Sequence, residues 1–176
     1  MPRKVEVVPY REEWEKMFRD ETQKLLQIPG AEYIVFNHIG STSVPGLNAK
    51  PIIDLLAEAN EIKTFDKLTP VFEEMGYKAK GENGIPGRRY FAKLNEKGEH
   101  LFHLHTFQKG NPEIRRHLIF RDFLRENPLE AARYAKIKET AAKTFPFDIE
   151  SYMNVKNPII QELEQKASKW EGSRKS

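Results

Sequence analysis

Cysteine is absent from the 176 residues of this chain, and so is any long apolar run. Without cysteine there can be no disulfide framework, no thiolate zinc site and no thiol nucleophile. No stretch approaches the roughly 20 apolar residues that a membrane helix needs, and the first residues lack the apolar core of a signal peptide. We therefore expect a cytoplasmic protein that has no membrane partner.

Charge, by contrast, is plentiful. Charged residues make up 31% of the chain and hydrophobic residues 39%, and the formal net charge is +3. The positive excess falls in residues 111–143, which contain eight Arg and Lys against five Asp and Glu. Such a segment could approach nucleic acid, but its interleaved acids favour a solvated, ion-paired helical surface.

Hydrophobic periodicity predicts one α+β domain over residues 1–170, followed by a frayed tail at 171–176. The predicted helices cover 11–27 and 61–75, and the predicted strands cover 32–39, 51–58, 88–94 and 101–107. The C-terminal third, residues 111–169, is predicted to be helical, with breaks at Asn127–Pro128, Pro146 and Asn157–Pro158. The pattern is thus a mixed β-sheet with flanking helices and a helical C-terminal third.

The segment that joins the first two predicted strands is the one that suggests chemistry. It contains Gly40, Ser41, Thr42 and Ser43, whose small side chains and hydroxyls leave backbone N–H groups open to an anion. Lys50 adds a cation that suits phosphate, and Asp54, isolated in an apolar strand, could hold a metal ion. The alternative is a turn that only connects two strands, but the presence of Lys50 and Asp54 next to it in the sequence favours phosphate binding.

Five motifs together resemble the GrpB family, and the likeness covers about residues 5–165. They are His38–Leu47, Ala49–Asp54, Gly84–Phe91, His103–His105 and Phe120–Arg125. This family is regarded as a divergent branch of the DNA polymerase beta-like nucleotidyltransferases. The resemblance implies a nucleotidyltransferase-like mixed sheet, a phosphorylated small molecule or nucleotide as ligand, and metal-assisted nucleotidyl or phosphoryl transfer with Asp54 as catalytic carboxylate.

The sequence departs from the superfamily at one position. Two-metal nucleotidyl transfer needs two carboxylates two residues apart on a strand, where they share a face and can hold ions about 3.5–4 Å apart. The first is Asp54, but the partner position holds Leu56. Glu58 shares the face, yet four residues along a strand span about 13 Å, which is too far. The expected transfer activity therefore stays open.

Two histidines could supply the missing ligands. His103 and His105 alternate on a predicted strand, so they share a face, and if that strand lies beside Asp54 the three residues could bind a divalent metal ion of unknown identity. The alternative is that both imidazoles hydrogen-bond to neighbours or line a polar cleft. His38 precedes the turn, and we expect it to orient the turn rather than bind metal.

Arg88 and Arg89 follow a glycine-rich loop and open a predicted strand. Their side chains should point to opposite faces, so at most one enters a cleft, where a guanidinium could bind phosphate. A structural ion pair is an equal alternative.

Three functional hypotheses follow. The first is a nucleotidyltransferase-fold protein that binds a phosphorylated small molecule, with or without metal-assisted transfer. The second is a ligand-binding or regulatory module that has lost the second carboxylate. The third, ranked last, is an RNA-binding accessory protein that uses the basic helices of 111–143. Substrate identity and oligomeric state stay undetermined.

Overall fold

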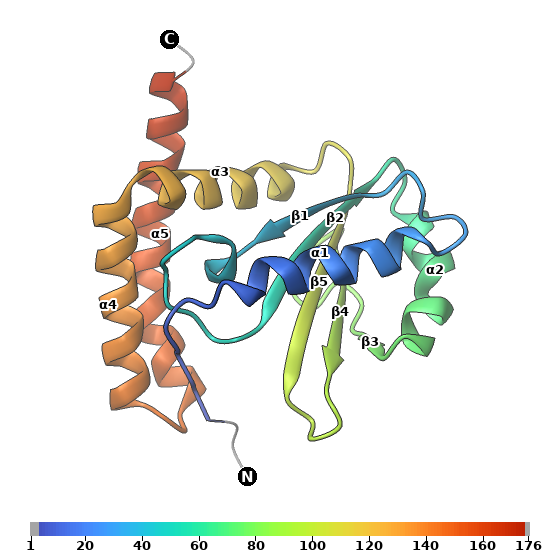
Figure 1. Ribbon diagram of the computed structural model, residues 1–176. Coiled ribbons are helices and arrows are strands. Elements are labelled where there is room, and N and C mark those ends of the chain that lie inside the picture. Colours follow the sequence, from blue (N-terminus) through green and yellow to red (C-terminus); the bar gives the residue numbers. More distant parts are fainter. Residues whose placement is uncertain (1–3, 175–176) are drawn as a thin grey trace.

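A computed structural model describes residues 4–174, and its centre is a five-stranded mixed sheet (Figure 1). In spatial order the strands are β1 (Val35–Ile39), β2 (Ile53–Ala59), β5 (His100–Gln108), β4 (Arg89–Leu94) and β3 (Tyr77–Ala79). Strands β2 and β5 are parallel, and every other neighbouring pair is antiparallel. The α+β prediction is confirmed.

The helices α1 (Glu13–Leu26) and α2 (Lys63–Glu74) cover one face of the sheet. Alternate strand residues such as Leu55 and Leu104 point to this face, because successive side chains on a strand point to opposite sides. They pack against Trp14 and Leu25 of α1 and Phe72 of α2 in the largest core cluster. Burying each such side chain fully is worth roughly 1.5–3 kcal/mol.

The opposite face is only partly covered. The helix α3 (Pro112–Glu126) lies over β1, β2 and β5, where Ile114 packs on Ile39, Leu56 and Phe107. Beside this apolar cluster, the same face carries Asp54 of β2 and His103 and His105 of β5. Ionisable side chains next to an apolar cluster are the natural place to look for a binding site.

The C-terminal third consists of α3, α4 (Pro128–Thr144) and α5 (Ile149–Arg174), and α4 and α5 lie side by side at one end of the sheet (Figure 1). These three helices share a core that includes Phe123, Tyr134 and Leu163. Val44 and Leu47, which follow the turn after β1, insert into the same cluster. The turn is therefore held between the sheet and the C-terminal helices.

Some predicted boundaries were wrong. The first two strands begin at Val35 and Ile53, later than predicted, and Pro51 lies in a bend before β2. The strand β3 was missed, because three residues are too few to show a period of two. The predicted breaks at Asn127–Pro128 and Pro146 are confirmed.

The predicted break at Pro158 was wrong, since α5 runs continuously through it. Proline removes the hydrogen bond to the carbonyl of Asn154, but Asn154 is exposed and that carbonyl can bond to water. Packing holds both halves of the helix, through Tyr152 before the proline and Leu163 after it. The helix also includes residues 171–174 of the predicted frayed tail, while 175 and 176 lie outside the described residues.

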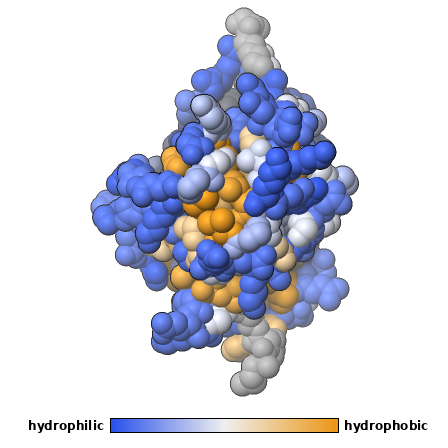
Figure 2. All heavy atoms as spheres, turned by 90° about the vertical axis from the view of Figure 1, so that its right-hand side faces the viewer, coloured by the Kyte–Doolittle hydropathy of each residue, from blue (hydrophilic) through white to orange (hydrophobic). Residues whose placement is uncertain are grey.

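The surface on the α2 side is mostly hydrophilic, with an apolar area at its centre (Figure 2). Within residues 4–174, every helix is too short or too polar to span a bilayer.

Candidate functional site

The carboxylate of Asp54 packs directly against the backbone of the turn that follows β1. Asp54 pairs with Ile39 of β1 on one side and His103 of β5 on the other. Gly40 has φ 76° and ψ −176°, a conformation that essentially only glycine adopts. A Cβ at this position would lie 2.6 Å from Oδ2 of Asp54. Glycine is thus required twice, for its backbone angles and for the close approach of the acid.

The hydroxyls of the turn serve different purposes. Residues Ser41–Ser43 form one turn of 3₁₀ helix, in which the Ser43 hydroxyl donates to the Gly40 carbonyl at 2.5 Å. The Thr42 hydroxyl lies 2.9 Å from Nε2 of His38, so His38 does orient the turn. The hydroxyls of Thr42 and Ser43 thus form internal hydrogen bonds, and Ser41 and Thr42 border a cavity together with Asp54.

This cavity, of about 380 Å³, lies between the turn, the polar face of the sheet and the helices α4 and α5. Three lysines, two histidines and one carboxylate line it: Lys50, Lys138, Lys156, His103, His105 and Asp54. We call it the lysine cavity. Its volume falls within the range of roughly 300–1,000 Å³ that is usual for small-molecule sites.

Lys138 of α4 is the most deeply buried of the three lysines. It is 3% exposed, and its ammonium group donates to Oγ of Ser41 at 2.8 Å and to the Asn48 carbonyl at 2.6 Å. The ammonium also lies 4.6 Å from the centroid of the Tyr134 ring. Burial, reinforced by the charges of Lys156 and Lys50, lowers the pKa of Lys138 to about 7.

The other two lysines flank a second tyrosine. Lys50 lies 4.6 Å from the ring centroid of Tyr152, and Lys156 of α5 lies 5.3 Å from it. Burial lowers the pKa of Lys156, and the charge of Asp54 partly opposes this. In the part of the chain that the structure describes, three ammonium groups and one carboxylate line the lysine cavity, and an anion would reduce the repulsion among the lysines.

The histidine pair meets Asp54 as the strand pairing predicted. Nε2 of His105 lies 3.0 Å from Oδ1 of Asp54, and Nδ1 of His103 lies 3.7 Å from it. Burial alone would raise the pKa of Asp54, but the hydrogen bond from His105 and the nearby imidazoles outweigh it, so this pKa is lowered. Asp54 is therefore held as a carboxylate.

The arrangement around His105 does not fit a metal ligand. A terminal nitrogen of Arg88 lies 3.2 Å from its Nδ1, and a guanidinium can only donate. Nδ1 must therefore accept, which places the ring proton on Nε2, directed at Asp54. The lone pair that a metal ion would need is occupied. Within the described part of the chain, no group of three His, Asp or Glu side chains could hold a metal ion.

The expected position of the second carboxylate lies in the core. Leu56 is 1% exposed and packs with Ile39 and Phe107 beneath α3. Position 56 therefore supplies no carboxylate that could hold a second metal ion beside Asp54.

The two arginines do point to opposite faces, and neither lines the lysine cavity. Arg88 is 6% exposed and donates to the carbonyls of Glu82 at 3.1 Å and Asn83 at 2.7 Å, in addition to His105. Arg89 forms an ion pair with Asp66 of α2 at 2.8 Å. Arg88 therefore positions His105, and Arg89 links the sheet to a helix.

Sequence reasoning missed two of the three lysines. Lys138 and Lys156 come from α4 and α5, far along the chain from the turn. Each follows a tyrosine by four residues, Tyr134 and Tyr152, and i, i+4 residues share a helix face. The repeated spacing of tyrosine and lysine is the signal that could have identified them.

The basic helices are extensively ion-paired. Arg116 contacts Glu113 and Glu164, and Arg115 contacts Glu171. Arg133 likewise contacts Glu130 and Glu162. The expectation of an ion-paired surface, rather than an uncompensated basic one, agrees with this arrangement.

Comparisons with known proteins agree with the sequence motifs. The family described as "GrpB protein" matches residues 4–166. Protein YqkA of Bacillus subtilis is 43% identical over 172 residues, which is 98% of this chain and 50% of YqkA. The chain thus spans half the length of this relative. The glutamate-rich protein GrpB of Alkalihalophilus pseudofirmus is 32% identical, covering 89% of this chain and 92% of that protein.

A solved structure extends the comparison to the fold. The crystal structure of the conserved protein GrpB from Enterococcus faecalis superposes with a TM-score of 0.87 at 43% sequence identity. The match covers 93% of this chain and 98% of that one. The sheet and the C-terminal helices that frame the lysine cavity are therefore features of an already observed fold.

Proposed function

The chain belongs to the GrpB family, and from that premise we propose that its lysine cavity binds a phosphorylated small molecule of the nucleotide class. One observation carries the proposal. Lys50, Lys138 and Lys156 converge on a cavity whose lining, within residues 4–174, includes one carboxylate, that of Asp54. Lysine is a point-charge binder of phosphate, and three lysines match the charge of a di- or triphosphate.

Ser41 fixes the position of Lys138 at the edge of the lysine cavity. Its Oγ accepts a hydrogen bond from Lys138 at 2.8 Å, and the same hydroxyl is hydrogen-bonded to Tyr134. Lys138 would then contact the phosphate directly. Phosphate charge stabilises protonated Lys138, so its pKa rises when the anion binds.

The site supports binding more directly than catalysis. A binding module needs no second carboxylate, and the buried Leu56 supplies none. Asp54 instead accepts a hydrogen bond from His105 and limits the excess of positive charge among the lysines. The ion pairs of the basic helices count against an RNA-binding surface there.

Calorimetric titration with ATP and with adenosine tests this function. We expect ATP to bind in the presence of a chelator, and adenosine, which has no phosphate, to give no heat. Lys138→Met and Lys156→Met should each weaken ATP binding by about tenfold or more, equivalent to about 1.4 kcal/mol. Lys136→Met, an exposed lysine on the same helix as Lys138, is the matched control and should leave the affinity unchanged.

A second readout is specific to Lys138. If ATP raises its pKa from about 7, the protein takes up protons at about pH 8, and the heat depends on the buffer's ionisation enthalpy. Lys138→Met should remove that dependence. The proposal would be wrong if adenosine bound as well as ATP, or if neither ATP nor pyrophosphate bound at all.

A further inference from the structure

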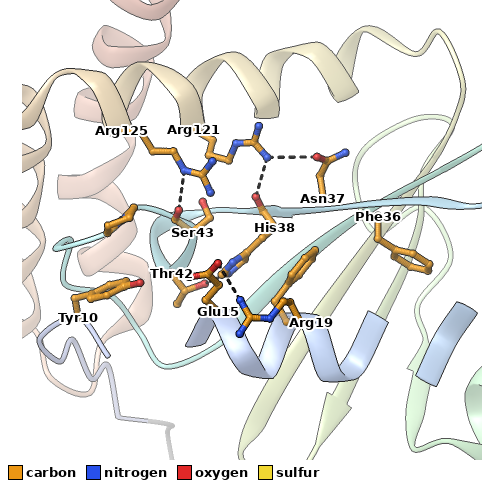
Figure 3. A pocket seen from close by; sticks show the side chains of 12 residues that line it. Tyr10, Glu15, Arg19, Phe36, Asn37, His38, Thr42, Ser43, Arg121 and Arg125 are labelled. Carbon is orange, nitrogen blue, oxygen red and sulfur yellow. Dashed lines mark hydrogen bonds and ion pairs between the residues drawn. The ribbon is translucent and has the colours of Figure 1, made fainter. Parts of the chain in front are cut away.

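A second and larger cavity, of about 620 Å³, borders the same turn between α1 and α3. None of the three lysines lines it. In Figure 3 the guanidinium groups of Arg121 and Arg125 project from α3 on one wall, and Glu15 and Arg19 of α1 lie opposite. We call it the arginine cavity. It contributes nothing to the function proposed above, so its chemistry needs an explanation of its own.

Arg121 is fixed in place by the sheet. Its side chain is 15% exposed, and it donates to Asn37 Oδ1 at 3.4 Å and to the His38 carbonyl at 3.2 Å. Its charge is balanced by Asp122, whose carboxylate lies 2.9 Å away. This guanidinium is therefore a rigid part of the wall.

Arg125 is different, because much of its hydrogen-bonding capacity is unused. Its Nε donates to the Ser43 carbonyl at 2.9 Å, but its terminal nitrogens make no hydrogen bond to any other residue of the described chain. The rigid Nε contact aims the open side of the guanidinium at the cavity. A guanidinium fork in this state matches a carboxylate or phosphate oxygen pair.

The arginines of the arginine cavity outnumber the carboxylates that pair with them by one. Among residues 4–174, Arg19 pairs with Glu15 at 3.1 Å and Arg121 pairs with Asp122, so Arg125 is the arginine of this cavity that forms no ion pair. The balance therefore suits a ligand whose head carries about one negative charge.

Flat rings form much of the remaining wall. The Phe18 ring stacks on the imidazole of His38 with centroids 4.9 Å apart and planes at 9°, and Tyr10 and Phe36 lie towards opposite ends of the cavity (Figure 3). His38 is 7% exposed, and its burial lowers its pKa to about 4, so it is uncharged at neutral pH. These surfaces suit a flat apolar body, since aromatic groups pack well against ring faces.

We propose that the arginine cavity binds a small organic anion in which a carboxylate or phosphate head is attached to a flat apolar body. The head contacts Arg125 with Arg121 beside it, and the body lies along Phe18 and Tyr10. This proposal does not depend on the ligand proposed for the lysine cavity, since the charged residues of the two cavities differ.

Titration of the full chain, followed by backbone amide NMR, tests the site with benzoate and phenyl phosphate as probes. At least one of them should shift the amide signals of Asn37, Ser43 and Arg125, while benzamide, the neutral isostere of benzoate, should leave them unchanged. A preference for phenyl phosphate identifies the head as phosphate, and a preference for benzoate identifies it as carboxylate. Absence of shifts with both probes, or equal shifts with benzamide, overturns the proposal.

Variants separate this site from the lysine cavity. Arg125→Gln should weaken the better probe by about tenfold or more, because the uncompensated charge and the fork are lost. Arg115→Gln is the control, since this exposed arginine lies on the same helix and pairs with Glu171 outside the cavity. Lys138→Met should leave probe binding unchanged.

Because Arg125 is exposed at the surface, its replacement is expected to keep the fold, and a thermal melt verifies this. Unchanged affinity in folded Arg125→Gln also overturns the proposal.

Discussion

The imidazole of His105 is 3.0 Å from the carboxylate of Asp54, and this contact fixes what both residues can do. On the other side of the ring, a terminal nitrogen of Arg88 lies 3.2 Å from Nδ1 of His105, so the three side chains form a chain of donors and acceptors. Each link has one direction, from the guanidinium to Nδ1 and from Nε2–H to the carboxylate. The carboxylate that the sequence suggested as a metal ligand is thereby the end of a hydrogen-bond chain.

This chain predicts one tautomer for His105. Nitrogen-15 NMR of the imidazole, recorded at about pH 8.5, should show the proton on Nε2. In Arg88→Met the donor to Nδ1 is lost, and both tautomers should then be populated. A proton found on Nδ1 in the unaltered protein would contradict the assigned directions.

The buried Lys138 should make stability depend on pH in the alkaline range. Its pKa is about 7 in the folded protein against its ordinary 10.5, so the unfolded chain binds more protons between these values. Stability therefore rises with pH across this window, by up to about 1.4 kcal/mol per pH unit from this residue.

Urea unfolding at several pH values between about 7 and 9 measures that slope. Lys138→Met should reduce it, because the methionine keeps the apolar stem and removes the ammonium group. Lys136→Met, at an exposed position, should leave it as it is. An equal slope in all three proteins would show that Lys138 does not carry the effect.

Restoring the second carboxylate should damage the fold instead of creating a metal site. Leu56 lies in a cluster with Ile39, Phe107 and Ile114, so Leu56→Asp buries an unpaired charge and should cost about 3 kcal/mol or more. Leu56→Met keeps the volume and should cost less than about 1.5 kcal/mol. Denaturant unfolding compares the two, and a stable Leu56→Asp protein that binds metal would refute this expectation.

Gly40 and Gly46 allow the contact with Asp54 to be separated from backbone strain. Both have positive φ, 76° and 83°, but an added Cβ meets Asp54 only at Gly40 and nothing within 4 Å at Gly46. Replacing either by alanine should cost about 1–3 kcal/mol of strain. Gly40→Ala should cost more than Gly46→Ala, and it alone should shift the His105 signals. Equal stabilities of the two variants would mean that the close contact is unimportant.

The contrast between Asp54 and Lys138 shows how far the sequence alone could go. Asp54 and the histidine pair lie on strands whose alternation predicts a shared face, and pairing of β2 with β5 brings them together. Lys138 reaches Ser41 only because α4 folds back across 97 residues of chain. That approach depends on how Val44 and Leu47 pack into the helical cluster. The spacing of Tyr134 and Lys138 predicts a shared helix face but not the contact with Ser41.

The sequence alone also could not predict the contacts of the Arg88 side chain or the position of the proton on His105. Alternation predicted that Arg88 and Arg89 would diverge, which they do. It could not predict that the carbonyls of Glu82 and Asn83 would hold Arg88 against His105, because loop carbonyls are placed by tertiary contacts.

Thr42 lines both the lysine cavity and the arginine cavity, so a single side chain contributes to the walls of two adjacent cavities. The hydroxyl of Thr42 contacts His38, which lines the arginine cavity. The neighbouring residue Ser41 lines the lysine cavity. If both cavities bind the proposed ligands, thermodynamic linkage makes any effect of one on the other reciprocal. By whatever factor the first changes the dissociation constant of the second, the second changes that of the first by the same factor.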